Sequence, residues 1–141
     1  MTSMREVDAL QAALAAEHAA VYGYGIVGAH LNGAPEEAAQ DAFDAHRAQR
    51  DRLRGLLLAR QATPVAAAPA YRLPFPVTDA ASAVRLAVRL EEGVAAAYAD
   101  LVMVENPALR DLGAQALREC AIRMARWRGS SVPFPGLPER T

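Results

Sequence analysis

Apolar residues recur every three or four positions along four stretches of the chain, which is the spacing of one face of an α-helix. Local signals at the ends of these stretches are typical of helix termini, for example Asn106 followed by Pro107 at the start of the last one. Together they predict helices at about residues 4–31, 36–61, 79–105 and 107–128. We therefore expect an all-α protein.

The connections between these helices differ greatly in length. Only a few residues join the first helix to the second and the third to the fourth, so each pair must form an antiparallel hairpin. Residues 62–78 contain four prolines and cannot be helical, but a segment of this length can cross the whole bundle. The sequence predicts one domain over residues 1–141: a four-helix antiparallel bundle, a crossover at 62–78, and an extended tail at 130–141 that packs outside or closes one end.

Ionisable side chains lie on or beside the apolar row of every predicted helix. Counting residues outward from the two short turns places them at about the same height in the bundle. They are Glu17 in the first helix, His46 and Arg50 in the second, Glu91 in the third, and Glu119 and Arg123 in the fourth. The fourth helix is ambiguous, because its most apolar row passes through Cys120 and the row beside it contains Glu119 and Arg123.

Buried charges are costly unless they are paired, so this layer needs an explanation. In one interpretation it is a closed structural network. Glu17 then pairs with Arg50, Glu91 pairs with Arg123, and His46 hydrogen-bonds a carboxylate. The planar guanidinium groups suit carboxylates and supply the positive charge that a metal would otherwise supply.

Two other interpretations give the same layer a ligand. Imidazole and carboxylate are suitable ligands for a transition metal, so one iron, manganese or zinc ion is an alternative, held by Glu17, His46, Glu91 and Glu119. Alternatively, Arg50 and Arg123 together receive the carboxylate or phosphate of a small anionic ligand. We find no arrangement of residues typical of a catalytic nucleophile or a nucleotide-binding loop.

The predicted helices, the long crossover and a carboxylate in the middle of the first helix resemble the ferritin-like superfamily. Its di-iron members carry one Glu on each of two helices and a Glu-x-x-His motif on each of the other two. Glu17 matches the first Glu, and Glu91 or its neighbour Glu92 matches the second. Phe43 stands where the first motif needs Glu, and Ile122 stands where the second needs His. The resemblance therefore implies a degenerate di-iron site and argues against a two-metal oxidase.

Three phrases look like an uncharacterised ferritin-like domain family of high-GC Gram-positive bacteria. They are EHAAVYGYG at 17–25, AYRLPFPV at 70–77 and FPGLP at 134–138. This resemblance covers nearly the whole chain and implies a fold without an established activity. Because ferritin-like bundles commonly pair side by side, it also implies a homodimer.

Composition narrows the possible partners. The net charge of −1 gives no electrostatic reason to expect nucleic acid as a partner. No apolar run is long enough to cross a membrane, and the first residues do not form a signal peptide. With a single cysteine, Cys120, the chain has no internal disulfide. We expect a cytoplasmic, non-enzymatic ferritin-like domain with no catalytic residue and no cofactor.

Overall fold

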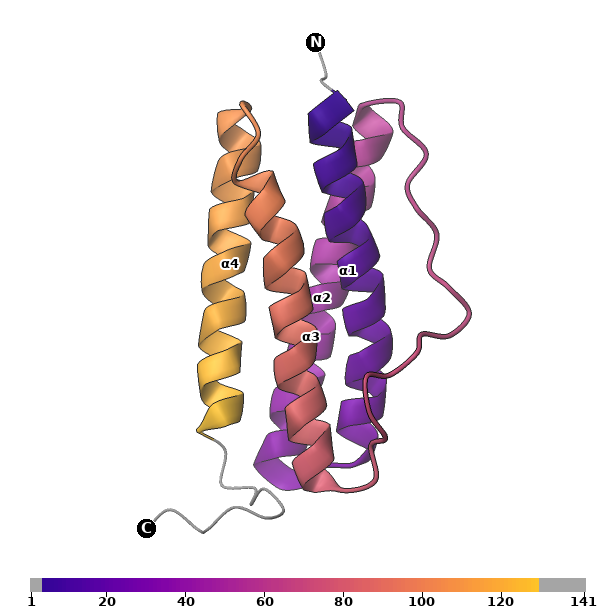
Figure 1. Cartoon of the computed structure of the whole chain (residues 1–141), viewed down its shortest axis with the longest axis vertical. Coiled ribbons are helices and arrows are strands. Elements are labelled where there is room, and N and C mark those ends of the chain that lie inside the picture. The colour runs from indigo at the N-terminus through magenta and orange to yellow at the C-terminus, as the bar shows by residue number, and fades with distance from the viewer. Residues whose placement is uncertain (1–3, 130–141) are drawn as a thin grey trace.

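The structure, a computed structural model, describes residues 4–129, which form four helices and no strand. The helices are α1 (Met4–Ala29), α2 (Gly33–Ala59), α3 (Ala80–Leu101) and α4 (Pro107–Arg128). α1 packs against both α2 and α3, and α4 packs against α3, so the chain folds as a bundle (Figure 1). The predicted all-α four-helix bundle is confirmed. The predicted tail at 130–141 lies outside the described residues.

The helix ends follow the local signals in the sequence. Asp79 caps α3 by accepting a hydrogen bond from the backbone N–H of Ser82, whose hydroxyl accepts one from the backbone N–H of Asp79. Asn106 caps α4 ahead of Pro107. α2 begins at Gly33, earlier than predicted, and the φ of +64° at this position is one that glycine adopts readily. α3 ends at Leu101 rather than near residue 105, because the chain already turns toward α4 there.

Residues 60–79 connect the end of α2 to the start of α3 and run along the outside of the bundle from one end to the other (Figure 1). This crossover lies against α1. The amide of Gln11 donates to the Thr63 carbonyl at 2.7 Å and accepts from the Val65 N–H at 2.8 Å. His18 hydrogen-bonds the Val65 carbonyl at 3.0 Å. A crossover of this kind places the start of α3 at the same end of the bundle as the turn between α1 and α2.

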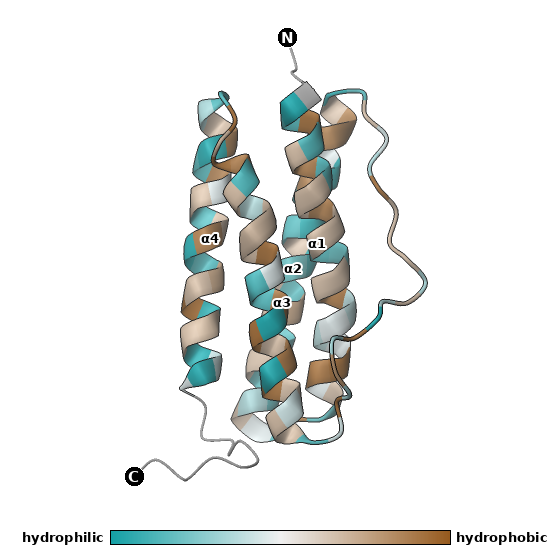
Figure 2. Ribbon diagram, viewed as in Figure 1, coloured by the Kyte–Doolittle hydropathy of each residue, from teal (hydrophilic) through white to brown (hydrophobic). Residues whose placement is uncertain are grey.

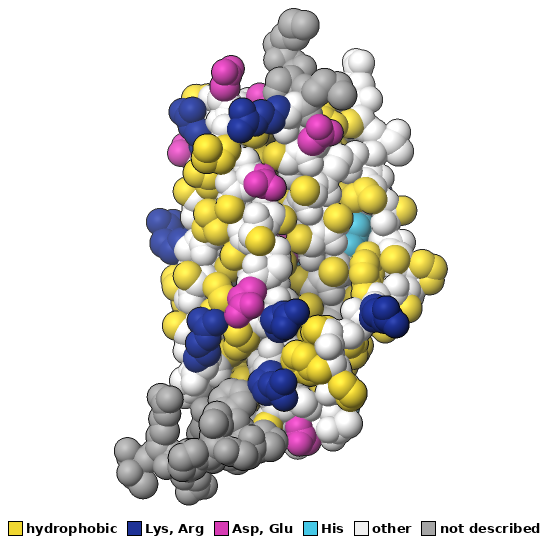
Figure 3. Space-filling model, in the orientation of Figure 1, with side chains coloured by type: hydrophobic (Ala, Val, Ile, Leu, Met, Phe, Trp, Pro, Cys, Tyr) yellow, Lys and Arg dark blue, Asp and Glu magenta, His cyan; other side chains and the backbone are white. Residues whose placement is uncertain are grey.

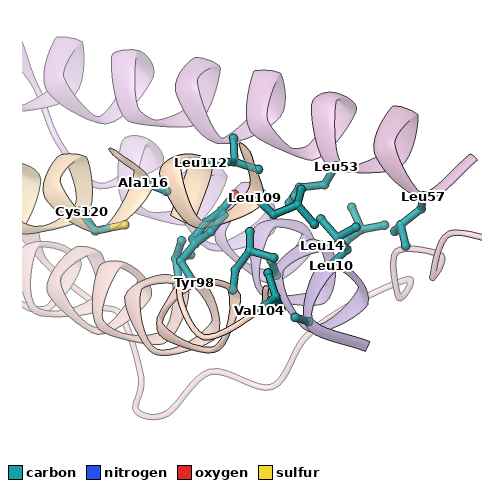
Figure 4. Close-up of a cluster of buried hydrophobic side chains, with 14 of the residues drawn as sticks. Leu10, Leu14, Leu53, Leu57, Tyr98, Val104, Leu109, Leu112, Ala116 and Cys120 are labelled. Carbon is teal, nitrogen blue, oxygen red and sulfur yellow. The ribbon is translucent and has the colours of Figure 1, made fainter. Parts of the chain in front are cut away.

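The apolar core is divided into two clusters. All four helices carry hydrophilic and hydrophobic residues in alternation around their surface (Figure 2). One cluster includes Leu10, Leu14, Leu53 and Leu57 at the end of the bundle near the N-terminus and extends toward Tyr98 (Figure 4). The other gathers side chains near the opposite end, including Val27, Leu31, Val84, Leu86 and Trp127. The buried side chains of Glu17, His46 and Glu91 lie between the two clusters.

Candidate functional site

His46 forms the centre of a buried polar layer at mid-bundle. Its Nδ1 lies 2.5 Å from Oε1 of Glu17 on α1, and its Nε2 lies 3.0 Å from Oε2 of Glu91 on α3. All three side chains are almost completely buried, with exposed fractions of 1% for Glu17 and His46 and 0% for Glu91. One imidazole from α2 therefore bridges two carboxylates that come from two other helices.

Two tyrosines donate hydrogen bonds to the carboxylates, each to the glutamate on the other helix. Tyr98 on α3 donates its hydroxyl to Oε2 of Glu17 at 2.8 Å, and Tyr24 on α1 donates to Oε2 of Glu91. Each tyrosine follows the glutamate of its own helix by seven residues, which is two helical turns. Because α1 and α3 run antiparallel (Figure 1), the tyrosine of each helix comes level with the glutamate of the other.

The hydrogen bonds continue in both directions from this core. The Gln49 amide donates to the Tyr98 hydroxyl at 3.3 Å, and the Trp127 indole N–H donates to the Tyr24 hydroxyl at 3.0 Å. Arg123 on α4 donates from Nε to Oε1 of Glu91 at 3.1 Å. Within residues 4–129, no buried side-chain nitrogen or oxygen lacks a hydrogen-bond partner. We call this set the buried polar network: Glu17, Tyr24, His46, Gln49, Glu91, Tyr98, Arg123 and Trp127.

The electrostatics of the network favour a protonated His46. Burial alone lowers the pKa of an imidazole, but the hydrogen bonds and negative charges of Glu17 and Glu91 outweigh it and raise the pKa of His46 to about 9. At neutral pH the imidazolium donates both of its N–H groups to carboxylates. Two carboxylates then face one imidazolium and one guanidinium, so the network is neutral overall without any added ion.

The pKa values of the neighbouring groups shift in the directions expected from these contacts. Burial raises the pKa of Glu91, yet the hydrogen bond and charge of His46 and the charge of Arg123 lower it below its usual value. Burial and the nearby carboxylates raise the pKa of Tyr24 and Tyr98, so both hydroxyls stay donors. Burial also raises the pKa of the Cys120 thiol to about 12, which makes it a poor nucleophile at neutral pH.

Of the six residues predicted for this layer, the structure brings together Glu17, His46, Glu91 and Arg123. The predicted pairing of Glu17 with Arg50 is wrong. Arg50 donates to the exposed Asp51 instead, and the inward position on that turn of α2 belongs to Gln49. After His46, the next inward-facing residue of α2 is Gln49, three positions on, rather than Arg50, four positions on.

Glu119 is also outside the network, so its predicted position is a second error. Its carboxylate accepts a hydrogen bond from Gln115, one turn earlier on the exposed side of α4. The buried face of α4 runs through Leu112, Ala116 and Cys120, which leaves Glu119 on its flank. Arg123 reaches Glu91 from that flank because its side chain is long.

The two halves of the chain contribute to the layer with the same spacing. His46 lies 29 residues after Glu17, and Cys120 lies 29 residues after Glu91. Gln49 and Arg123 lie 32 residues after the same two glutamates. Together with the seven-residue spacing of each tyrosine from its glutamate, this gives the two hairpins an internal correspondence that the sequence alone did not reveal.

The donor set does not fit a metal ion in this arrangement. Among residues 4–129, no three His, Cys, Asp or Glu side chains are placed to hold one. Both imidazole nitrogens of His46 already face carboxylates, and the oxygens of Glu17 and Glu91 already accept hydrogen bonds from His46, Tyr98, Tyr24 and Arg123. A metal would have to displace the imidazolium protons, and the predicted fourth ligand, Glu119, is not in the layer.

The surface gives no comparable concentration of one charge on the face viewed in Figure 3, where arginine side chains and acidic side chains are interspersed among apolar ones. No helix in the part of the chain that the structure describes is long and apolar enough to cross a membrane.

Comparison with known proteins places the chain in a family. Residues 9–139 match the family described as a domain of unknown function (DUF4439). The chain belongs to this family. It is also similar to the crystal structure of a conserved hypothetical protein, rv2844, from Mycobacterium tuberculosis, with 39% sequence identity and a TM-score of 0.87. That match covers 92% of this chain and 98% of the other. No curated protein matches. The predicted membership of a family without an established activity is therefore confirmed, and the similar structure comes from a high-GC Gram-positive bacterium. The ferritin-like part of that prediction stays a prediction.

Proposed function

We propose that this protein is a non-enzymatic ferritin-like module in which the buried polar network replaces a di-iron site. The observation that carries the proposal is the doubly bonded His46, which supplies a positive charge midway between two buried carboxylates. Arg123 supplies a second positive charge on Glu91. Two organic cations thus balance the charge that metal ions balance in a di-iron bundle.

The spacing of the two hairpins supports the same proposal. A di-iron bundle needs one Glu on each of two helices and a Glu-x-x-His pair on each of the other two. Glu17 and Glu91 occupy the first type of position. The paired positions, three residues apart, correspond to His46 with Gln49 and to Cys120 with Arg123. In this register neither pair retains the Glu and His that a di-iron site requires.

The geometry gives less support to the two alternatives that the sequence left open, a degenerate metal site and a site for a small anion. A degenerate metal site would need Glu119, which lies on the flank of α4. A small anion held between Arg50 and Arg123 would need two guanidinium groups facing each other, whereas Arg50 bonds Asp51 and Arg123 bonds Glu91. Homodimer formation and a cytoplasmic location remain predictions.

Metal content tests the proposal directly. Protein purified from medium supplemented with iron, manganese and zinc should contain less than about a tenth of an equivalent of each, because residues 4–129 offer no ligand set for a metal ion. Elemental analysis of the pure protein measures this. A stoichiometric metal that survives dialysis, and that is lost in a Glu17→Gln variant, would contradict the proposal.

A designed variant tests whether residues 46 and 49, and residues 120 and 123, occupy the positions of the two Glu-x-x-His motifs. Restoring both motifs with His46→Glu, Gln49→His, Cys120→Glu and Arg123→His should create a site that binds about two equivalents of zinc or manganese. The matched control completes the motifs in the other register with Phe43→Glu and Ile122→His. It should bind none, because Ile122 is 45% exposed and Glu119 is not in the layer. Metal binding by the control and not by the restored variant would show that the register is wrong.

A further inference from the structure

A groove lies between the first turns of α2 and the last turns of α4. These two helix ends are at the same end of the bundle (Figure 1), but α2 and α4 are not among the closely packed helix pairs. The groove has a volume of about 400 Å³. Small side chains on α2, including Ala38 and Ala42, form one wall, and Arg123, Arg126 and Trp127 form the other.

The groove opens onto the buried polar network. Trp127 lines it and donates its indole N–H to Tyr24, and Arg123 lines it and donates to Glu91. Arg123 is 19% exposed, whereas Glu91 is not exposed at all. Whatever covers the groove therefore shields the ion pair between Arg123 and Glu91 from water.

We propose that the segment after α4, residues 130–141, docks in this groove. α4 ends at Arg128, one residue beyond Trp127, so the segment begins at the edge of the groove. Its sequence, SSVPFPGLPERT, supplies two large apolar side chains, Phe134 and Leu137, for a groove with small apolar side chains on its α2 wall and Trp127 on the other. The family match extends to residue 139, so it includes this segment as part of the domain.

The length of the segment is sufficient. Leu137 follows Gly129 by eight residues, which span up to about 27 Å when extended. Along the α2 wall Ala42 also follows Ala34 by eight residues, but this distance is only about 12 Å, because a helix rises 1.5 Å per residue. Three prolines, at 133, 135 and 138, restrict the backbone to extended conformations and so lower the entropic cost of docking.

The charges of the groove and the segment are complementary. Arg126 and Asp41 line the groove, and among the described residues Arg126 takes part in no ion pair. The segment carries an acidic residue, Glu139, followed by a basic one, Arg140. Docking places Glu139 toward Arg126 and Arg140 toward Asp41, while Phe134 and Leu137 fill the apolar part of the groove beside Trp127.

Paired cysteines in the full chain test this docking. In a Cys120→Ala background, which has no other cysteine, Ala38→Cys is combined with Leu137→Cys and oxidised with oxidised glutathione. A disulfide needs Cα atoms within about 7 Å, so docking should give rapid intramolecular closure. The matched control pairs Leu137→Cys with Gln40→Cys, on the same turn of α2 but facing a different hollow beside α1.

The ratio of the two closure rates is the readout, because even an undocked segment meets any cysteine within its reach, at a rate set by its effective concentration. We expect the Ala38 pair to close at least about tenfold faster than the Gln40 pair. Equal rates would overturn the proposal, and so would disulfides that form only between two chains. As a second measurement, Phe134→Ser with Leu137→Ser should make Trp127, the only tryptophan, more accessible to acrylamide quenching. Unchanged quenching would overturn the proposal as well.

Discussion

Replacing His46 with leucine is expected to lower the free energy of unfolding by about 3–5 kcal/mol, because it removes the cation from between two buried carboxylates. Glu17 and Glu91 would each lose a hydrogen-bond donor, and their charges would face each other in a dry interior. The packing of leucine compensates little, since the cost comes from the charges that remain. Urea unfolding followed by circular dichroism at pH 6 measures the loss.

Arg50→Met is the matched control on the same helix. Arg50 lies one turn after His46 and bonds only the exposed Asp51, so its replacement should change stability by less than about 1 kcal/mol. A second control, Glu17→Gln combined with Glu91→Gln and His46→Leu, removes the stranded charges and should recover part of the lost stability. If His46→Leu proved as harmless as Arg50→Met, the network would not be the charged structure described above.

Stability is expected to fall as the pH rises from about 6 to 10, because the pKa of His46 is raised to about 9 in the folded protein. A group with a raised pKa contributes its full stabilisation below its unfolded value of 6.5 and loses it as the pH passes through the folded value. At about 1.4 kcal/mol per pKa unit, the His46 contribution amounts to about 3 kcal/mol. Urea unfolding at a series of pH values measures it.

A His46→Gln variant separates this effect from other titrations. Cys120 and the tyrosines also lose protons at high pH in the unfolded chain, but they do so in both proteins, and the difference between the two stability curves cancels this effect. That difference should shrink between pH 6 and 10. On the acid side, the lowered pKa of Glu91 stabilises the fold above its ordinary value and is lost as the pH falls through the folded value. Parallel curves between pH 6 and 10 would contradict a protonated His46.

The helices could be predicted from the sequence because the residues at their ends are ones that cap or start helices. Asp79, Asn106 and Pro107 satisfy or avoid backbone N–H groups at helix starts, and these requirements do not depend on the rest of the fold. The unequal linkers then left few ways to arrange four helices. The sequence pattern places the end of α3 too late, because the apolar Val104 continues the helical spacing. In the structure Val104 is buried, but it lies in the connection between α3 and α4.

The buried layer could be located from sequence, but its pairing could not. Counting from the turns placed Glu17, His46 and Glu91 at one height because helical rise is constant. A three-residue and a four-residue step both stay on one helix face, so the pattern did not distinguish Gln49 from Arg50. In α4 the sequence likewise did not decide whether the row through Cys120 or the row through Glu119 faces the core. The geometry of packing between helices decides both choices.

The tyrosines had a signal in the sequence that was not used. Tyr24 and Tyr98 donate hydrogen bonds to carboxylates, but the layer predicted from the sequence does not include them. Each follows a buried glutamate by two helical turns, and an antiparallel arrangement of their helices pairs them crosswise. Recognising this required the knowledge that α1 packs against α3, which no residue spacing within one helix provides.

The charge state of His46 is the claim on which the account depends, and nitrogen-15 NMR of the histidine side chains measures it directly. The chain has three histidines, and the His46→Gln variant assigns the signals of His46 by their absence. At pH 7.5 we predict an imidazolium with protons on both Nδ1 and Nε2, which titrates only as the pH approaches 9. A neutral ring at pH 7.5, with one nitrogen unprotonated, would contradict the account.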